Sequence, residues 1–239
     1  MAIFAIGDLH LSGSGAKPMD VFGQHWENHF DQIRENWRQM VTPDDTVLIP
    51  GDISWAMLFE EAMIDIRSIA ELPGQKVLLR GNHDYWWSSV SRLRAALPKG
   101  MYALQNDAIA VDGVAVCGTR GWDFPTDLYP LNDQETKVYR RELLRLEMAL
   151  KSAAAHNLPI LAMTHYPPLL NDIRDTAFTA LLERYGVTLC LYGHLHGNGI
   201  HNGFNGLHQG VQYRLVSCDS IAFSPVKVWD TPKAQVAAE

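Results

Sequence analysis

Five short motifs place metal-binding side chains directly after runs of apolar residues. In chain order they are Gly-Asp-x-His, Gly-Asp, Gly-Asn-His-Asp, a single Thr-His and Gly-His-x-His. The side chains that could coordinate a metal are Asp8, His10, Asp52, Asn82, His165, His194 and His196. Oxygen and nitrogen donors without cysteine suit divalent ions such as Mn, Fe, Zn, Co or Ni. Seven ligands are too many for one tetrahedral site, so we predict two metals that share one carboxylate.

Such a centre has a recognisable chemistry. Two divalent ions roughly 3.5–4 Å apart hold a phosphoryl group in line and generate a nucleophilic hydroxide. Two divalent ions bring more positive charge than Asp8 and Asp52 offset, so the site would be cationic although the chain has a formal net charge of −7. A phosphate ester would be attracted to it more strongly than a neutral substrate.

The elements that must position these residues can be read from hydrophobic periodicity. Strand-like apolar runs cover 2–6, 46–49, 77–79, 160–163 and 187–191. Apolar residues recur at spacings of four and three from Trp26 through Phe30, Ile33 and Trp37 to Met40, which predicts one helix face. Further helices are expected over 56–70, 88–97 and 132–155. Alternating strands and helices indicate a sheet with parallel strands. Ligands bind outside the carboxyl ends of such strands, where all five motifs fall.

The remaining segments add β structure. The stretch 101–117 contains three short strand-like pieces, broken at Asn106-Asp107 and Asp112-Gly113, which suggests hairpins. Segments 213–217 and 226–229 are again strand-like. A length of 239 residues without a repeat or a convincing linker predicts a single domain over 1–239.

The order and spacing of the five motifs resemble the calcineurin-like metallophosphoesterase superfamily. The motifs extend from Gly7 to Gly197 and so cover most of the chain. The resemblance implies an α/β fold, a four-layer αββα sandwich of two mixed β-sheets flanked by helices. It also implies a dinuclear metal-dependent phosphohydrolase, in which a metal-bridging hydroxide attacks a phosphate mono- or diester.

The resemblance further implies a role for each motif residue. One metal would be held by Asp8, His10 and His196. The second would be held by Asn82, His165 and His194, with Asp52 bridging the two. His83 would not be a ligand, and would donate a proton to the leaving oxygen or steady the phosphate. Asp84 would accept a hydrogen bond from the His83 ring, so His83 and Asp84 are the predicted catalytic residues.

One motif departs from the family pattern. The second motif is often GDxxD, extended to GDxxDRG in the serine/threonine protein phosphatases. In this chain it reads Gly51-Asp52-Ile53-Ser54-Trp55, so Trp55 replaces the second carboxylate and the arginine is absent. Protein dephosphorylation is therefore a poor prediction, although the metal ligands are complete.

Two other functions stay open. The chain could be a metal-dependent nuclease, or a non-catalytic scaffold on the same fold. The acidic composition weighs against nucleic acid, and the complete ligand set weighs against a scaffold. The expected partner is a small phosphorylated substrate. The short apolar N-terminus and the lack of a long apolar run predict a cytoplasmic protein with no membrane segment, whereas the oligomeric state is not predicted.

Several residues outside the motifs have two interpretations. Trp86 and Trp87 could form a stacking wall for an aromatic leaving group, although core packing is the favoured interpretation. Arg120 could bind a phosphate with two hydrogen bonds, although a surface ion pair is the favoured interpretation. Lys17 is a candidate lid residue in a Gly-rich segment.

Histidines and cysteines outside the motifs have simpler expected roles. His25 and His29 are spaced like a metal-binding pair, but a solvated helix face is favoured. Cys117, Cys190 and Cys218 lie in apolar runs without CxxC spacing, so we expect buried thiols rather than disulfides.

Overall fold

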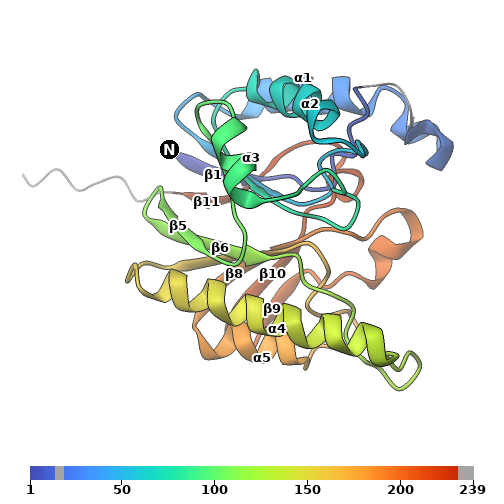
Figure 1. The fold of residues 1–239 in the computed structure, drawn as a ribbon, viewed down its shortest axis with the longest axis vertical. Coiled ribbons are helices and arrows are strands. Elements are labelled where there is room, and N and C mark those ends of the chain that lie inside the picture. Colours follow the sequence, from blue (N-terminus) through green and yellow to red (C-terminus); the bar gives the residue numbers. More distant parts are fainter. Residues whose placement is uncertain (14–18, 231–239) are drawn as a thin grey trace, which may run out of the picture.

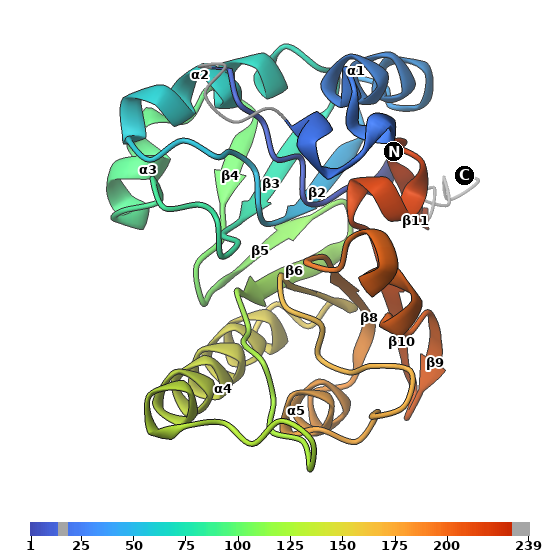
Figure 2. The ribbon, with the colours of Figure 1, turned by 90° about the vertical axis from the view of Figure 1, so that its right-hand side faces the viewer.

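Two mixed β-sheets lie face to face, and helices cover the outer face of each sheet (Figures 1 and 2). The computed structural model describes residues 1–13 and 19–230, so the candidate lid residue Lys17 lies outside the described residues. The layers run from helices through two sheets to helices again, which confirms the expected four-layer αββα sandwich.

The first sheet has the strand order β11-β1-β2-β3-β4. Its strands are β1 (Ala2–Ala5), β2 (Thr46–Pro50), β3 (Gln75–Leu79), β4 (Met101–Ala103) and β11 (Val226–Asp230). Strands β1 to β4 are parallel, whereas β11 runs antiparallel to β1. Helices α1 (His29–Met40), α2 (Phe59–Ala70) and α3 (Val90–Ala96) cover the outer face of this sheet (Figure 1).

The second sheet has the order β5-β6-β7-β8-β10-β9. Its strands are β5 (Ala108–Val111), β6 (Val114–Thr119), β7 (Ile160–Thr164), β8 (Val187–Tyr192), β9 (Gly206–His208) and β10 (Val211–Leu215). Its outer face carries α4 (Asp133–Ala154) and α5 (Ala177–Arg184) (Figure 1). Four short 3-10 helices complete the described elements: η1 (Met19–Phe22), η2 (Gln24–Trp26), η3 (Gly197–Asn202) and η4 (Cys218–Ile221).

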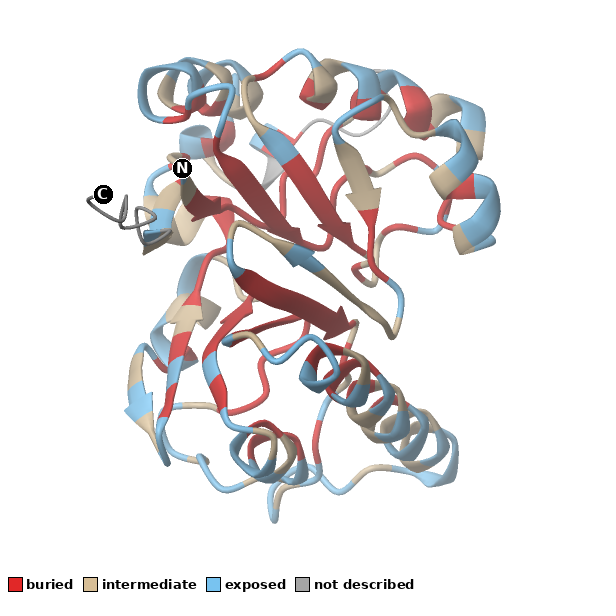
Figure 3. Ribbon diagram, turned by 90° about the vertical axis from the view of Figure 1, so that its left-hand side faces the viewer, coloured by how far each residue is buried: buried red, intermediate tan, exposed pale blue. Residues whose placement is uncertain are grey.

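Burial on both faces explains why the central strands are apolar along their length. In β1, Ile3 and Ala5 pack against the second sheet, whereas Phe4 packs toward the helices. The central strands are buried from end to end (Figure 3). Continuous apolar runs are typical of parallel strands that are covered on both sides. This packing fixes the strand ends, and therefore the loops that follow them.

Two sequence-based boundaries were wrong. Helix α1 begins at His29 rather than at Trp26, because Asn28 has a left-handed backbone (φ 51°) that separates η2 from α1. The break at Asn106-Asp107 is not a hairpin turn, since β4 and β5 belong to different sheets. The break at Asp112-Gly113 does form a hairpin, and it joins the antiparallel strands β5 and β6.

Other expectations concern buried side chains and membrane segments. Trp86 and Trp87 are each 2% exposed and belong to the core of the first sheet, which confirms core packing. Cys117, Cys190 and Cys218 are buried free thiols. None of the helices in the described part of the chain has both the length and the apolar character that crossing a membrane requires.

Candidate metal centre

The loops after β1, β2, β3, β7 and β8 meet at one edge of the sandwich. Backbone hydrogen bonds join these loops in pairs. The amide of Asp8 donates to the carbonyl of Gly51 (2.9 Å), and the amide of His10 donates to the carbonyl of Asp52 (2.9 Å). On the other sheet, the amide of Gly193 donates to the carbonyl of His165 (3.1 Å). The loops therefore form one connected frame for the side chains of the motifs.

Four of the predicted ligands have left-handed backbone conformations. Their φ angles are 56° at Asp8, 46° at His10, 49° at Asp52 and 73° at His194. Such conformations cost on the order of 1–3 kcal/mol each in residues other than glycine. They persist because the surrounding loops fix them, and clusters of them are typical of functional sites.

Two motif glycines leave room for the carboxylates. A Cβ on Gly81 would overlap the carboxylate of Asp52, and a Cβ on Gly193 would overlap the carboxylate of Asp8. Close approach of backbone to a functional group is a common reason for glycine. The glycines of the third and fifth motifs thus allow the strand ends of both sheets to close around the two acids.

The first group of donors joins the first and last motifs. Asp8, His10 and His196 each offer a ligand atom, and these atoms lie within 4.8 Å of one another. The Nε2 atoms of His10 and His196 are 3.2 Å apart, and Nε2 of His196 is 3.4 Å from Oδ1 of Asp8.

The second group lies around Asn82. Its Oδ1 atom is 2.6 Å from Nε2 of His165 and 2.9 Å from Nδ1 of His194. The two imidazole nitrogens are 3.3 Å apart.

Asp52 lies between the two groups. Its Oδ2 atom is 3.4 Å from Nε2 of His165 and 3.7 Å from Nε2 of His10. Two ligands at about 2.1 Å from one cation are roughly 3.0–3.4 Å apart at octahedral or tetrahedral angles. Most of the donor separations match this range, so the residues fit a metal centre. The structure brings all seven predicted ligands together.

The four histidines of the candidate centre differ in pKa. Burial would lower the pKa of His165, but Asp52 and Asp8 raise it to about 9. Burial also disfavours charge on His196, whereas its bonds to Asp219 and Asp8 raise its pKa to about 10. Burial lowers the pKa of His10 and of His194 to about 4.

The two carboxylates remain ionised despite their burial. Burial would raise the pKa of Asp52, but the charge and hydrogen bond of His165 lower it well below its usual range. Contacts with His196 likewise lower the pKa of Asp8 against the effect of burial. Without a cation, protons on His165 and His196 balance these acids. A bound metal would displace those protons.

The ring orientation of His165 and of His196 is fixed by the partner of the Nδ1 atom. Nδ1 of His165 faces the carbonyl of Pro50 (3.1 Å), which leaves Nε2 toward Asn82. Nδ1 of His196 is 2.9 Å from Oδ1 of Asp219. Partners of this kind fix the ring of a ligating histidine and raise its basicity. Asp219 was missed from the sequence, although it follows β10 as the motif residues follow their strands.

His83 and Asp84 lie next to the centre but do not contact each other as expected. Oδ2 of Asp84 accepts the amide N–H of Gly81 (2.7 Å). Its Oδ1 accepts from the amides of Ile53 (2.9 Å) and Ser54 (3.2 Å), and from the Trp86 indole (3.0 Å). The buried Nδ1 atom of His83 has no hydrogen-bond partner among the described residues. The predicted bond between the two side chains was therefore wrong, because the backbone of two loops occupies the carboxylate.

Asp84 is a buried acid with an unusual environment. Burial and the negative charge of Asp52 raise its pKa to about 6, whereas the N–H bonds from Gly81 and Ser54 act in the opposite direction. These bonds connect the loop that carries Asn82 to the loop that carries Asp52. Asp84 therefore joins the two loops that carry these candidate ligands.

A hollow of about 270 Å³ opens beside His83, and we call it the aromatic hollow. Its lining residues are His10, Met19, His25, Trp26, Trp55, His83, His196 and Gly197. The Trp55 ring lies 4.3 Å from the His83 ring and stacks on His10 at 4.9 Å, measured between ring centroids. The aromatic surface next to the centre thus comes from Trp26 and Trp55, not from Trp86 and Trp87.

His29 differs from its expected environment, whereas Arg120 forms the expected ion pair. His29 is half-buried, and its two nitrogens face the carbonyls of Leu9 (2.9 Å) and Trp26 (3.2 Å), so it is neither a solvated residue nor half of a metal pair with His25. The carbonyl of Arg120 accepts a hydrogen bond from the amide N–H of His165 (2.9 Å). The guanidinium of Arg120 lies 4.0 Å from the carboxylate of Glu142.

Comparison with known proteins agrees with this architecture. The model of a family described as calcineurin-like phosphoesterase matches residues 1–198. No curated protein matches the chain.

Two solved structures share the fold. A protein of unknown function from Aquifex aeolicus has 16% identity and a TM-score of 0.54, and the match covers 95% of each chain. GAP50, described as the anchor in the inner membrane complex of Plasmodium, has 13% identity and a TM-score of 0.50. That match covers 92% of this chain and 72% of the other. At these identities the likeness shows the fold alone.

Proposed function

The chain belongs to the calcineurin-like phosphoesterase family, and on that premise we propose that it is a dinuclear metal-dependent phosphohydrolase acting on a small phosphate mono- or diester. The observation that carries this proposal is the arrangement of donors in two groups with Asp52 between them. Asp8, His10 and His196 would hold one divalent cation, whereas Asn82, His165 and His194 would hold the other.

The metal centre has the charge and the donors that phosphoryl transfer requires. When bound, two divalent cations supply a water that is acidic enough to attack phosphorus and positive charge that balances the phosphate oxygens. Asp52 would bind both cations. Asn82 would contribute a neutral oxygen, so the site would keep a net positive charge.

His83 is a candidate for the group that interacts with the leaving oxygen. It lines the aromatic hollow, and its amide N–H donates to Oδ1 of Asp52 (2.8 Å), which places its ring beside the centre. We propose that this ring donates a proton to the leaving oxygen or a hydrogen bond to the phosphate. The two roles differ in their dependence on the leaving group, because a poor leaving group needs the proton most.

The aromatic hollow supports a class of substrate. Its walls are the rings of Trp26, Trp55 and the neighbouring histidines, so a flat apolar group would be desolvated there. We propose that the leaving group carries an aromatic or apolar ring. Trp55 occupies the position of the second acid in the GDxxD form of the family motif, so this position makes an apolar rather than a charged contact.

The location of the protein is proposed on a separate basis. Three free thiols, at Cys117, Cys190 and Cys218, fit a reducing compartment. We propose the cytoplasm.

A panel of esters tests the proposed function. Metal-stripped protein would be reconstituted with Mn, Fe, Zn, Ni or Co and given mono- and diesters with aromatic or alkyl leaving groups. We expect hydrolysis that requires a divalent metal, with a lower KM for aromatic esters. Trp55→Ala should raise KM for the aromatic esters and leave KM for the alkyl esters nearly unchanged. An absence of turnover with every metal and every ester would contradict the proposal.

His83→Ala separates the two roles of His83. If the ring donates a proton, kcat should fall by about 10²–10⁴-fold for alkyl esters and far less for esters of acidic phenols. An equal loss for both would assign the ring to the phosphate. An unchanged rate for alkyl esters would remove His83 from the mechanism.

A further inference from the structure

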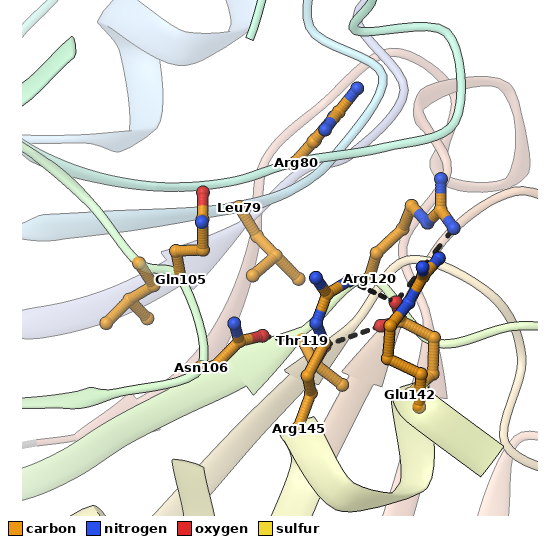
Figure 4. A pocket seen from close by; sticks show the side chains of 10 residues that line it. Leu79, Arg80, Gln105, Asn106, Thr119, Arg120, Glu142 and Arg145 are labelled. Carbon is orange, nitrogen blue, oxygen red and sulfur yellow. Dashed lines mark hydrogen bonds and ion pairs between the residues drawn. The ribbon is translucent and has the colours of Figure 1, made fainter. Parts of the chain in front are cut away.

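A second cavity, of about 200 Å³, lies between the ends of β3 and β6 and the middle of α4 (Figure 4). Four arginines line it, namely Arg80, Arg120, Arg141 and Arg145, and we call it the arginine cavity. None of the seven metal donors contributes to its lining. Its volume is more than tenfold larger than the roughly 10–15 Å³ that a single water needs.

Positive charge in the arginine cavity is only partly balanced. Among the described residues that line it, Glu142 is the only carboxylate. Glu142 is fully buried and is already engaged, since it accepts from Nη1 of Arg145 (2.6 Å) and from the hydroxyl of Thr119 (2.8 Å). Nη2 of Arg120 lies 4.0 Å from the same carboxylate (Figure 4). One acid thus faces several guanidinium groups.

Two of the four arginines have no acid of the described residues within ion-pair distance, although the charges of Asp84 and Glu142 act on Arg80 from further away. Within the described ranges, neither Arg80 nor Arg141 forms an ion pair. The Nε atom of Arg80 is also buried without a hydrogen-bond partner. A buried donor that stays unsatisfied costs free energy, and so does the repulsion between neighbouring cations. An anion in the cavity would remove both costs.

Polar side chains complete a site for a compact anion. Gln105 and Asn106 also line the cavity, beside the arginines. Planar guanidinium groups match the oxygens of phosphate in bidentate geometry. This concentration of positive charge stands out in a chain whose formal net charge is −7.

From these observations we propose that the arginine cavity binds a phosphoryl-type oxyanion at a site separate from the metal centre. Arg141 and Arg145 on α4 would close on the anion from one side, with Arg80 and Arg120 on the loops after β3 and β6 opposite. Those two loops also touch the metal centre, because Arg80 precedes Gly81-Asn82 and the carbonyl of Arg120 accepts from His165 (2.9 Å).

Calorimetric titration of metal-stripped, full-length protein with inorganic phosphate tests the site. Without metals, the centre lacks the cations that would hold phosphate there, and the outcome does not depend on hydrolytic activity. We expect saturable binding of one phosphate per chain. Arg141→Gln should weaken it about fivefold, and Arg141→Gln with Arg145→Gln by more than about tenfold, because charge-assisted hydrogen bonds are lost. The Arg141 side chain is exposed, so its variant should fold normally.

Arg140→Gln is the matched control. Arg140 is the preceding residue of α4, is exposed, and lines a different hollow with Tyr139 and Pro125. Its variant should bind phosphate within twofold of the unmodified chain. No saturable binding to the unmodified chain would overturn the proposal. Equal weakening in Arg140→Gln and in the double variant would also overturn it, since the binding would then be a general surface effect.

The source of the oxyanion is identified with the metal-loaded enzyme. If the cavity holds a second phosphoryl group of the substrate, Arg141→Gln should raise KM for a doubly phosphorylated ester and not for its singly phosphorylated counterpart. If it holds free phosphate, KM should stay the same for both, and calorimetric phosphate binding should persist under saturating ester. Either pattern supports the site, provided that the titration of the stripped protein shows it.

Discussion

His196 is held by carboxylates at both ring nitrogens. Nδ1 lies 2.9 Å from Asp219, and Nε2 lies 3.4 Å from Asp8. Asp219 also accepts the amide N–H of Gly197 (3.0 Å), so it fixes both the ring and the loop that carries it. The side chain of Asp219 is nearly buried, which strengthens the charge interaction. Asp219 is therefore predicted to act on metal affinity through His196.

Asp219→Asn should weaken metal binding about 10- to 100-fold, because the carboxylate no longer supports the imidazole. Metal-dependent activity should shift to higher metal concentration, with most of kcat recovered at saturation. Asp230→Asn is the control, since Asp230 is exposed and bonds only to Lys227 among the described side chains. Metal titrations in which the two variants behave alike would contradict the role of Asp219.

Protons and metals compete at His165 and His196. The pKa values of about 9 and about 10 mean that both rings are protonated at pH 7 in the metal-free chain. Metal binding requires neutral imidazole, so loading the site should release about two protons at pH 7. Metal affinity should then rise with pH and level off above about pH 10. Calorimetry in buffers of different ionisation enthalpy counts the protons, and a pH-independent affinity between pH 6 and 9 would refute this assignment.

At the scale of elements, the sequence predicted which strands carry the site. Parallel strands buried on both faces must end at a common edge, so Asp8, Asn82 and His165 could be brought together from apolar runs alone. The chemistry after each strand was visible because the motifs are local. Long-range partners were not visible in this way. Asp219 and Glu142 are single acids whose roles depend on how η4 and α4 pack.

Asp84 shows the same limit at a motif residue. Its position after His83 suggested a pair of side chains, but its four hydrogen bonds go to three backbone amides and one indole. The left-handed turn at Asp52 brings the amides of Ile53 and Ser54 to this carboxylate. That backbone geometry could not be derived from residue types.

Asp84→Ala should therefore destabilise the loops and not merely slow the reaction. Three buried amides would lose their acceptor, which costs about 1–3 kcal/mol for each group left unsatisfied. We expect a clear fall in Tm together with weaker metal binding. His83→Ala provides the comparison and should leave Tm within a few degrees. A normal Tm and normal metal content in Asp84→Ala, with a lower kcat, would instead support a catalytic pair.

On the scale of the whole molecule, the site needs both sheets. The loops after β1 to β3 carry Asp8, His10, Asp52 and Asn82, whereas the loops after β7 and β8 carry the remaining three candidate ligands. The match to the family ends at residue 198, yet β9 and β10 complete the second sheet and β11 completes the first. Asp219 lies between β10 and β11 in the sequence, so this part of the chain both closes the sandwich and holds the ring of His196.

The fold class could be predicted from hydrophobic periodicity, and the local motifs predicted a set of side chains that the structure brings together. The aromatic hollow and the arginine cavity could not be predicted from the sequence. The aromatic hollow depends on η2 and the loop after β2 bringing Trp26 and Trp55 to the same histidine, His10. The arginine cavity depends on residues after β3 and at the end of β6 lying near α4. Both arise from packing between elements that are distant in the sequence.

The central claim is that two metals share Asp52 and that hydrolysis needs both. Its most direct test is to titrate stripped protein with Mn²⁺, measuring bound metal per chain and the rate of ester hydrolysis on the same samples. We predict that the rate stays low through the first equivalent and rises with the second, and that Asp52→Asn lowers both metal content and rate. Full activity with one equivalent, or in the stripped chain, would contradict the dinuclear account.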